Sequence, residues 1–400
     1  MAKDFSEVLR QPISAAELER RWALARAAMK AEDIDCLVMQ SDNTYLGMYV
    51  RWFTDIFVEV GYPWTVIFDA RDGMTTIGHG AEVDTLRVTP DDIPSSFGTK
   101  RRITAPYFMS CHYLGTMDAA AAVRDLKDRK TKKVGVVGKA VMGAAFYEHL
   151  LTNLPGVEIV DATDMIDRIQ VVKSAEEIGL IRKTARIEDE AMAEILNFVR
   201  PGMAEYEIRA ELFRILTNKG SEMQWIMIGS APAGQPGGMV KYAHYHNRIL
   251  RPGDQMTLLI EVNGPGGYYC ELGRTICLGS MADETAQAWE VGRGAQKATV
   301  AKLVPGAKPA EVLKTYNEYI MAHGEPREAR AFSHGQGYNL VERPLIRDDE
   351  PMVLQANMNL SCHPNATAGN KAWVNFCDNF LITDHGAERL HKTLQEIFVV

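Results

Sequence analysis

The sequence predicts an α/β domain followed by an α+β domain. At 400 residues the chain is longer than one hydrophobic core usually organises, so two domains are expected. Strand-like and helix-like segments alternate up to Asp161, whereas the rest of the chain twice shows two helices followed by strands. We place the boundary at residue 165, which gives an N-terminal domain of residues 1–165 and a C-terminal domain of residues 166–400.

The elements of the N-terminal domain follow from hydrophobic periodicity. Apolar residues recur at helical spacing after Ala15, where Leu18, Trp22, Ala25 and Met29 share one side. Short apolar runs bounded by turn residues indicate strands. The predicted helices cover 15–32, 117–128 and 142–153, and the predicted strands cover 35–39, 62–68, 74–77, 133–138 and 157–160.

The C-terminal domain opens with a helix that has its own start signal. Ser174 and Glu177 fit a capping box, in which each side chain accepts a hydrogen bond from the other residue's backbone N–H. Pro201 and Gly202 end this helix. Further helices are predicted at 205–219, 283–303 and 310–322, and strands at 224–228, 353–361 and 373–381. The repeated order suggests two lobes, each with its helices on one side of a sheet.

The segment from Met256 to Gly279 predicts a β-hairpin around a Gly/Pro turn. Glu261 lies in the first arm and Glu271 in the second, and both have apolar neighbours. A carboxylate in such surroundings is costly unless it is paired, hydrogen-bonded or bound to a metal ion. The two glutamates therefore indicate a functional site, although the polar face of an edge hairpin would also place them so.

Composition and charge exclude several classes of function. The formal net charge of -8 disfavours nucleic acid as a partner. No apolar run is long enough to span a bilayer, and the N-terminal residues lack the pattern of a secretory signal. The six cysteines form no C-x-x-C pair, which fits reduced thiols. We expect a cytoplasmic protein without membrane or nucleic-acid partners.

Several motifs of the second half resemble the creatinase/prolidase/methionine-aminopeptidase family, the "pita-bread" enzymes. They occur in the family's order and are K-S-A-E-E-I-G-L-I-R-K from Lys173, P-G-M-A-E-Y-E-I at Pro201, R-P-G-D at Arg251, G-Y-Y-C-E-L-G-R-T at Gly267, H-G-Q-G-Y-N-L-V-E-R-P at His334 and D-N-F-L-I-T at Asp378. The resemblance implies a creatinase-type N-terminal domain and a pita-bread catalytic domain. It also implies a homodimer in which each site lies near the partner's N-terminal domain.

The family's metal-dependent members hold two divalent ions with carboxylates and one histidine, and this chain departs from that pattern. The corresponding positions carry Glu261, Glu271, His334, His363 and Cys377. Losing the last two carboxylates removes ligands that a pair of Mn²⁺, Co²⁺ or Mg²⁺ ions needs. We therefore predict no metal pair and no required cofactor. The alternative is a single ion, Fe²⁺ or Zn²⁺, held by Glu271, His334 and His363.

The metal-free branch of the family is creatinase-like and uses a histidine as its general base. Here that position matches His244, with His246 in reserve, and histidine suits proton transfer near neutral pH. We predict that His244, Glu271, His334 and His363 are catalytic. We predict that substrate is bound by Glu261, Arg51, Tyr62, Glu342 and Asp378. For Arg51 two interpretations stay open, a residue that binds an anionic group of the substrate or a surface arginine.

The predicted function is hydrolysis of a C–N bond, amide-like or amidino, in a small molecule. This chain has Gly273 and His363 where the resemblance to creatinase would require guanidinium-binding glutamates, so its substrate differs from creatine. Three other functions stay open. They are a lyase acting on a small carboxylate, a divergent Xaa-Pro metallopeptidase and a binding protein without catalytic activity.

Overall fold

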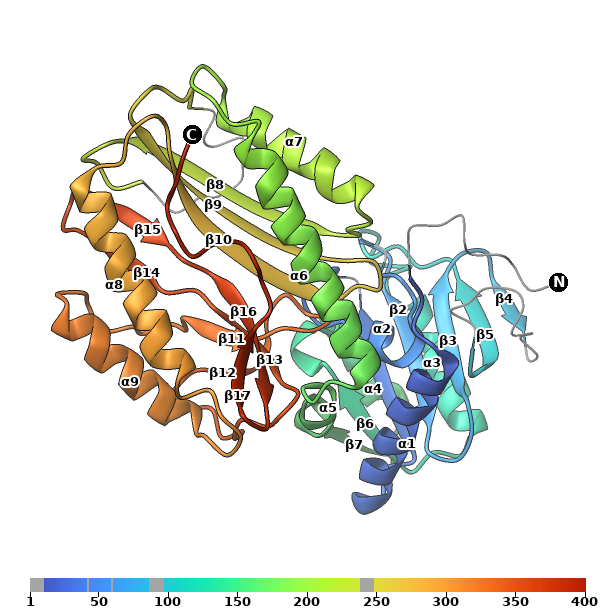
Figure 1. The fold of residues 1–400 in the computed structure, drawn as a ribbon. Coiled ribbons are helices and arrows are strands. Elements are labelled where there is room, and N and C mark those ends of the chain that lie inside the picture. The colour runs from blue at the N-terminus through green and yellow to red at the C-terminus, as the bar shows by residue number, and fades with distance from the viewer. Residues whose placement is uncertain (1–10, 42, 59, 86–96, 238–247) are drawn as a thin grey trace. The chain divides into compact units, whose positions relative to one another are not determined.

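The computed structural model describes residues 11–41, 43–58, 60–85, 97–237 and 248–400 (Figure 1). The chain divides into two compact units, 1–170 and 171–400. The division comes slightly after the predicted boundary at residue 165 because helix α5 (Thr163–Gln170) belongs to the first unit. No helix in the described ranges has the length and apolar character needed to cross a bilayer.

The N-terminal unit is built on a mixed seven-stranded sheet. The strands lie in the order β4-β5-β3-β2-β1-β6-β7, with β1, β6 and β7 parallel to one another. Its elements are α1 (Ala15–Ala31), β1 (Cys36–Ser41), α2 (Tyr49–Thr54), β2 (Trp64–Asp69), β3 (Met74–His79), β4 (Val83–Thr85), β5 (Thr99–Ala105), α3 (Met117–Asp128), β6 (Lys133–Val137), α4 (Ala144–Asn153), β7 (Glu158–Asp161) and α5. The predicted alternation of strands and helices is confirmed.

Four of these elements, α2, β4, β5 and α5, were not predicted. Strand β5 contains the run Lys100-Arg101-Arg102, which has no apolar alternation. It forms because β3 pairs with it along its length, and Arg101 binds Asp84 and Asp125. Long-range pairing thus overrides the local pattern.

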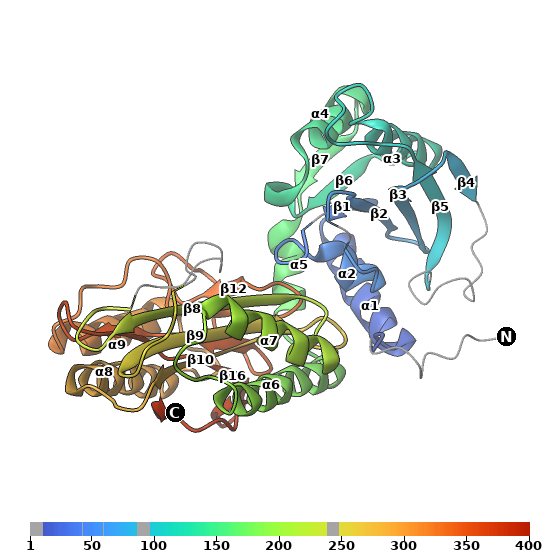
Figure 2. The ribbon, with the colours of Figure 1, turned by 90° about the horizontal axis from the view of Figure 1, so that it is seen from above.

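The C-terminal unit contains two main sheets, each packed against its own pair of helices (Figures 1 and 2). One sheet has the order β18-β10-β9-β8 and the other β12-β11-β13-β16-β17. The elements are α6 (Ala175–Leu196), α7 (Glu205–Asn218), β8 (Gln224–Pro232), β9 (Asp254–Asn263), β10 (Tyr269–Cys277), α8 (Asp283–Val300), α9 (Pro309–Ala322), β11 (Ser333–Gly335), β12 (Glu342–Leu345), β13 (Asn359–Cys362), β14 (Asn365–Thr367), β15 (Trp373–Asn375), β16 (Asp378–Thr383), β17 (Gly386–Arg389) and β18 (Phe398–Val399).

The predicted start of α6 is confirmed in detail. Ser174 Oγ accepts a hydrogen bond from the Glu177 backbone N–H at 3.2 Å, and Glu177 Oε2 accepts one from the Ser174 N–H at 2.7 Å. The apolar side of α6, including Ile187, Ala191 and Ile195, then packs on the hairpin side chains Leu258 and Leu272. The capped helix α6 therefore covers one face of the hairpin and shares its hydrophobic core.

The predicted hairpin consists of β9 and β10, paired antiparallel from Gln255–Cys277 to Asn263–Tyr269. Glu261 and Glu271 lie directly opposite each other in this register. Gly273 forms a bridge with Cys377, which joins the hairpin sheet to the segment before β16. The register and the bridge place both glutamates next to the second sheet.

Two predicted strands were wrong in extent. The strand predicted over 373–381 is two strands, because β15 pairs with β14 and β16 pairs with β13, and the chain changes partner at Cys377. The strand predicted over 353–361 is formed only from Asn359 onward. Asn357 has a left-handed backbone (φ 70°), which turns the chain before the strand starts.

Candidate functional site

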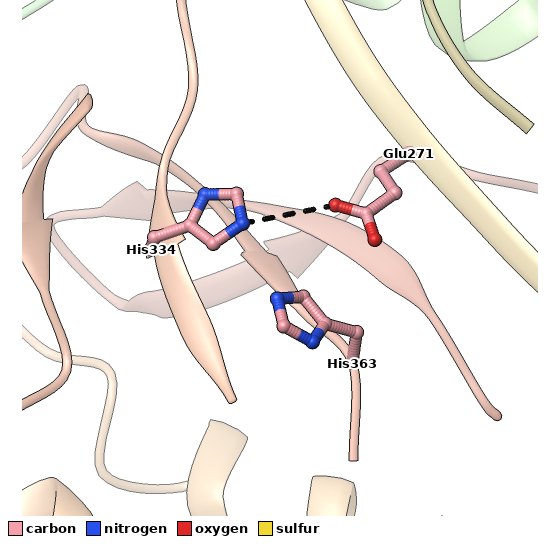
Figure 3. A group of neighbouring side chains, drawn as sticks. All are labelled: Glu271, His334 and His363. Atoms are coloured by element: carbon pink, nitrogen blue, oxygen red, sulfur yellow. Dashed lines mark ion pairs between the residues drawn. The ribbon is translucent and has the colours of Figure 1, made fainter. Parts of the chain in front are cut away.

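Glu271, His334 and His363 converge in the C-terminal unit (Figure 3). Glu271 lies on β10 and His334 on β11, and His363 is the residue directly after β13. One potential ligand atom from each lies within 4.8 Å of the other two, and all three residues are buried. Within the described ranges this is the one group of three or more His, Cys, Asp and Glu side chains close enough to hold a metal ion.

The protonation of His334 follows from its hydrogen bonds. Nδ1 lies 3.0 Å from the carbonyl oxygen of Gly335, which can only accept, so Nδ1 carries the proton. Nε2 is then the lone-pair nitrogen, and Ser361 Oγ can donate to it at 3.2 Å. The same Nε2 lies 3.9 Å from Glu271 Oε2. The space between them suits a proton, a water molecule or a cation.

Burial keeps both imidazoles neutral. It lowers the pKa of His334 to about 4 and that of His363 to about 3, and at His363 the neighbouring His334 adds to the effect. The two rings are 5.1 Å apart between centroids. At neutral pH the lone pair of each imidazole can therefore accept a hydrogen bond or bind a metal ion.

Glu271 and Glu261 form a carboxyl pair beside the histidines. Their side chains hydrogen-bond to each other. Burial, reinforced by Glu271, raises the pKa of Glu261 well above its ordinary range, and burial raises the pKa of Glu271 to about 7. Two adjacent buried carboxyl groups cannot both ionise cheaply, so the pair shares a proton near neutral pH.

The arrangement fits one metal ion and does not fit two. Two imidazoles and one carboxylate are a ligand set used for Fe²⁺ and Zn²⁺, and one ligand atom of each side chain lies within 4.8 Å of the other two. Cys377 offers no further ligand, because its Sγ donates to the Glu271 carbonyl oxygen at 3.4 Å and burial raises its pKa well above the ordinary range. Glu261 is bound by Glu271 and by the amide of Gln336.

Glu342 and Asp378 are buried in ion pairs. Glu342 binds Lys173 and accepts from Asn339 Nδ2 at 3.4 Å. Asp378 accepts from Arg274 at 2.8 Å, and both side chains are wholly buried. A Cβ added at Gly337 would meet the Lys173 ammonium at 2.6 Å and overlap the Glu342 carboxylate, so a larger residue there would displace the first ion pair. Neither carboxylate belongs to the group of Glu271, His334 and His363.

Arg51 and Tyr62 lie in the N-terminal unit. Arg51 is fully buried in α2, with Nε 3.8 Å from Asp55 Oδ1, so the alternative of a surface arginine is wrong. Tyr62 is half-buried and packs on His79 at 4.3 Å between ring centroids. His244 and His246 lie outside the described residues.

Three polar residues of this site had no predicted role: Gln336, Ser361 and Asn379. Gln336 donates to both glutamates, Ser361 contacts His334, and Asn379 Oδ1 accepts from the Glu271 N–H at 2.7 Å. Strand alternation could have indicated Gln336, which follows His334 by two residues. Ser361 and Asn379 give a weaker signal, since each is a polar residue in an otherwise apolar strand.

Sequence comparisons relate this chain to known proteins. The profile of Metallopeptidase family M24 covers residues 179–384. The probable dipeptidase PepE of Mycobacterium tuberculosis is 27% identical over 252 residues, which are 62% of this chain and 66% of that protein. A creatinase of Bacillus sp. is 27% identical over 232 residues, 53% of this chain and 54% of its own length. This chain therefore matches less than two thirds of the length of either protein.

Solved structures show the fold over nearly the whole chain. An Xaa-Pro dipeptidase from Bacillus anthracis superposes with a TM-score of 0.77 at 18% identity, covering 96% of this chain and all of that one. A dipeptidase PepE from Mycobacterium ulcerans gives 0.76 at 21% identity, covering 98% and 100%. The predicted fold class, an α/β N-terminal domain with a pita-bread C-terminal domain, is confirmed.

Proposed function

Because the chain belongs to metallopeptidase family M24, we propose that it is an enzyme that hydrolyses a C–N bond of a small polar molecule, at Glu271, His334 and His363. Relatives named as dipeptidases, Xaa-Pro dipeptidases and a creatinase support this reaction class. The observation that carries the proposal is the group itself. Two neutral imidazoles lie beside a carboxyl group whose pKa, raised by burial, is about 7.

The side chains supply the proton transfers of a hydrolysis. A base takes a proton from water while the oxygen adds to the carbon, and the nitrogen leaves after it receives a proton. Glu271 can take and return a proton near neutral pH, and His334 offers Nε2 as an acceptor because Nδ1 is held by the Gly335 carbonyl. His363 is the second acceptor. His244 stays the proposed general base of the creatinase-like alternative.

We propose that this site binds at most one metal ion. Glu271, His334 and His363 would hold it, and a bound Fe²⁺ or Zn²⁺ would lower the pKa of a water molecule and polarise the scissile group. The carboxyl pair and the thiol of Cys377 do not provide the shared anionic ligands of a second ion. A two-ion peptidase mechanism is therefore disfavoured.

The remaining residues are assigned supporting roles. We propose that Glu342 and Asp378, each buried in an ion pair, stabilise the strands around the site instead of contacting substrate. Glu261 holds Glu271, whereas Arg51 and Tyr62 stay candidates for substrate recognition. We also propose a homodimer that brings the partner's N-terminal unit near each site. The six free cysteines support a reducing compartment such as the cytoplasm.

The test is a substrate screen with matched variants. N-acyl and N-amidino amino acids and Xaa-Pro dipeptides are incubated with the purified protein, and released amines are quantified. His334→Ala and His363→Ala should each reduce turnover by about 10²–10⁴-fold. The control is His385→Ala, an exposed histidine outside the site, which should retain wild-type activity.

Melting temperatures separate chemistry from stability in this screen. Folded variants of His334 and His363 that keep wild-type turnover on the identified substrate would show that these side chains are scaffolding. Cleavage of Xaa-Pro dipeptides that requires two Mn²⁺ ions per chain would favour the peptidase alternative.

A further inference from the structure

Gln336 is a buried amide that contacts both members of the carboxyl pair. It lies just after β11 and is fully buried. Its Nε2 donates to Glu261 Oε1 at 3.0 Å and, at a longer 3.4 Å, to Glu271 Oε2. The same nitrogen reaches the Leu340 carbonyl oxygen at 3.1 Å. Its N–H groups thus point at acceptors only.

The orientation of this amide is fixed by a chain of hydrogen bonds that begins at a backbone donor. The Glu271 N–H can only donate, so its partner atom on Asn379, 2.7 Å away, is the carbonyl oxygen. Asn379 Nδ2 must then donate, and it reaches Gln336 Oε1 at 2.8 Å and Asn359 Oδ1 at 3.1 Å. With its oxygen so engaged, Gln336 presents its nitrogen to the two carboxyl groups. No flipped orientation satisfies the same partners.

Gln336 occupies carboxylate lone pairs that a cation between Glu261 and Glu271 would need as ligands. A metal pair in a shared site is held about 3.5–4 Å apart by carboxylate oxygens that face both ions. Here an oxygen of each carboxyl group accepts from Gln336, and the two groups also bond to each other. The neighbouring thiol of Cys377 is directed to the Glu271 carbonyl oxygen.

We propose that Gln336 is a positioning residue that takes the place of a second cation. Its uncharged amide holds the Glu261–Glu271 pair through hydrogen bonds and limits the site to at most one divalent ion. The family to which the chain belongs is named for metal-dependent peptidases, so this residue would mark where the chain departs from them. The proposal shares its site with the proposed hydrolysis but is tested by ion counting, and either can fail without the other.

The experiment counts Mn²⁺ ions per chain in the intact protein. Wild type, Gln336→Glu and Gln336→Met are stripped with a chelator, dialysed against Mn²⁺ and analysed by elemental mass spectrometry and titration calorimetry. Gln336→Glu puts a third carboxylate beside Glu261 and Glu271, and a cation is then the remaining means of neutralising them. It should bind one more Mn²⁺ per chain than wild type. Gln336→Met removes the donor without adding a ligand and should keep the wild-type count.

Gln255→Glu is the matched control. Gln255 is also buried, in strand β9 of the same hairpin, and hydrogen-bonds to Thr285 and to the Gln235 carbonyl oxygen. Its replacement adds a buried carboxylate away from the carboxyl pair, so it should not change the ion count. Mn²⁺ at ~100 times its Kd should raise the Tm of Gln336→Glu by about 5 °C relative to its metal-free form.

Two results would overturn the proposal. One is a wild-type protein that binds two Mn²⁺ ions per chain, a count that remains informative even if Gln336→Glu does not fold. The other is a folded Gln336→Glu variant with the wild-type ion count. A wild type with no more than one ion, together with an extra ion in this variant alone, supports it.

Discussion

At the scale of single residues, the sequence already singled out the side chains that converge. Glu271 and His334 were selected from motifs that lie far apart in the chain, and His363 from its place before Pro364. The structure brings their ligand atoms together, whereas their catalytic role stays a prediction. The role of Gln336 was not predicted, because an uncharged amide gives no sign of a functional site in the sequence. Its role depends on hydrogen bonds to two carboxyl groups on another sheet.

Asp118 provides a residue-scale test in the N-terminal unit. Its carboxyl group is buried and accepts from Gln40 Nε2 at 2.9 Å, and burial raises its pKa from 3.8 to about 6. The native state therefore keeps a proton that the unfolded chain releases between about pH 4 and pH 6. Its contribution to the free energy of unfolding should fall by about 3 kcal/mol over that interval, at ~1.4 kcal/mol per pKa unit.

The measurement is guanidinium unfolding of wild type and Asp118→Asn from pH 4 to pH 7. The variant should lose this part of the pH dependence, because an amide does not titrate. Asp72→Asn, at an exposed aspartate, is the control and should keep the wild-type profile. An unchanged slope in Asp118→Asn would refute the assignment.

At the scale of elements, local sequence signals such as caps and turns predicted helices and strands correctly where the same segments are also buried. The capping box at Ser174 and the Gly/Pro turn of the hairpin both gave elements close to those observed. Local signals failed where tertiary pairing decides, as in β5 with its three basic residues and in the break between β15 and β16 at Cys377. A period of two cannot reveal that a strand changes sheet partway along.

The bridge between the hairpin and Cys377 depends on Gly273. A Cβ at this position would meet Cys377 Cβ at 2.9 Å and Leu259 Cδ1 at 3.0 Å, and would overlap Asn375 Oδ1. Gly273→Ala should therefore lower the free energy of unfolding by about 1–3 kcal/mol through overpacking.

The control for that variant is Gly179→Ala. Gly179 is exposed in the second turn of α6, and an added Cβ would meet nothing within 4 Å. The change should stabilise the helix by about 0.5–1 kcal/mol. Chemical denaturation of both variants measures their free energies of unfolding. A Gly273→Ala protein as stable as wild type would contradict the described packing.

At the scale of the whole molecule, composition and motif order were enough to predict two units and the pita-bread fold. The structural units divide after residue 170, five residues beyond the predicted boundary at residue 165, because α5 belongs to the first unit. Oligomeric state is a property of the surface, and here the proposal of a homodimer follows the resemblance.

Light scattering coupled to gel filtration tests the dimer directly. We expect a mass twice that of the single chain at micromolar concentration. A single peak at the monomer mass, unchanged on addition of substrate, would argue against a site completed by the partner's N-terminal unit.

The central claim is that this site hydrolyses a C–N bond, and the origin of the oxygen in the product tests it most directly. The substrate identified in the screen is turned over in H₂¹⁸O, and the products are analysed by mass spectrometry. Hydrolysis places one ¹⁸O atom on the carbon that has lost its nitrogen, and His363→Ala should form that labelled product at a greatly reduced rate. Products that carry no ¹⁸O and contain a new carbon–carbon double bond would show that the enzyme is a lyase and contradict the account.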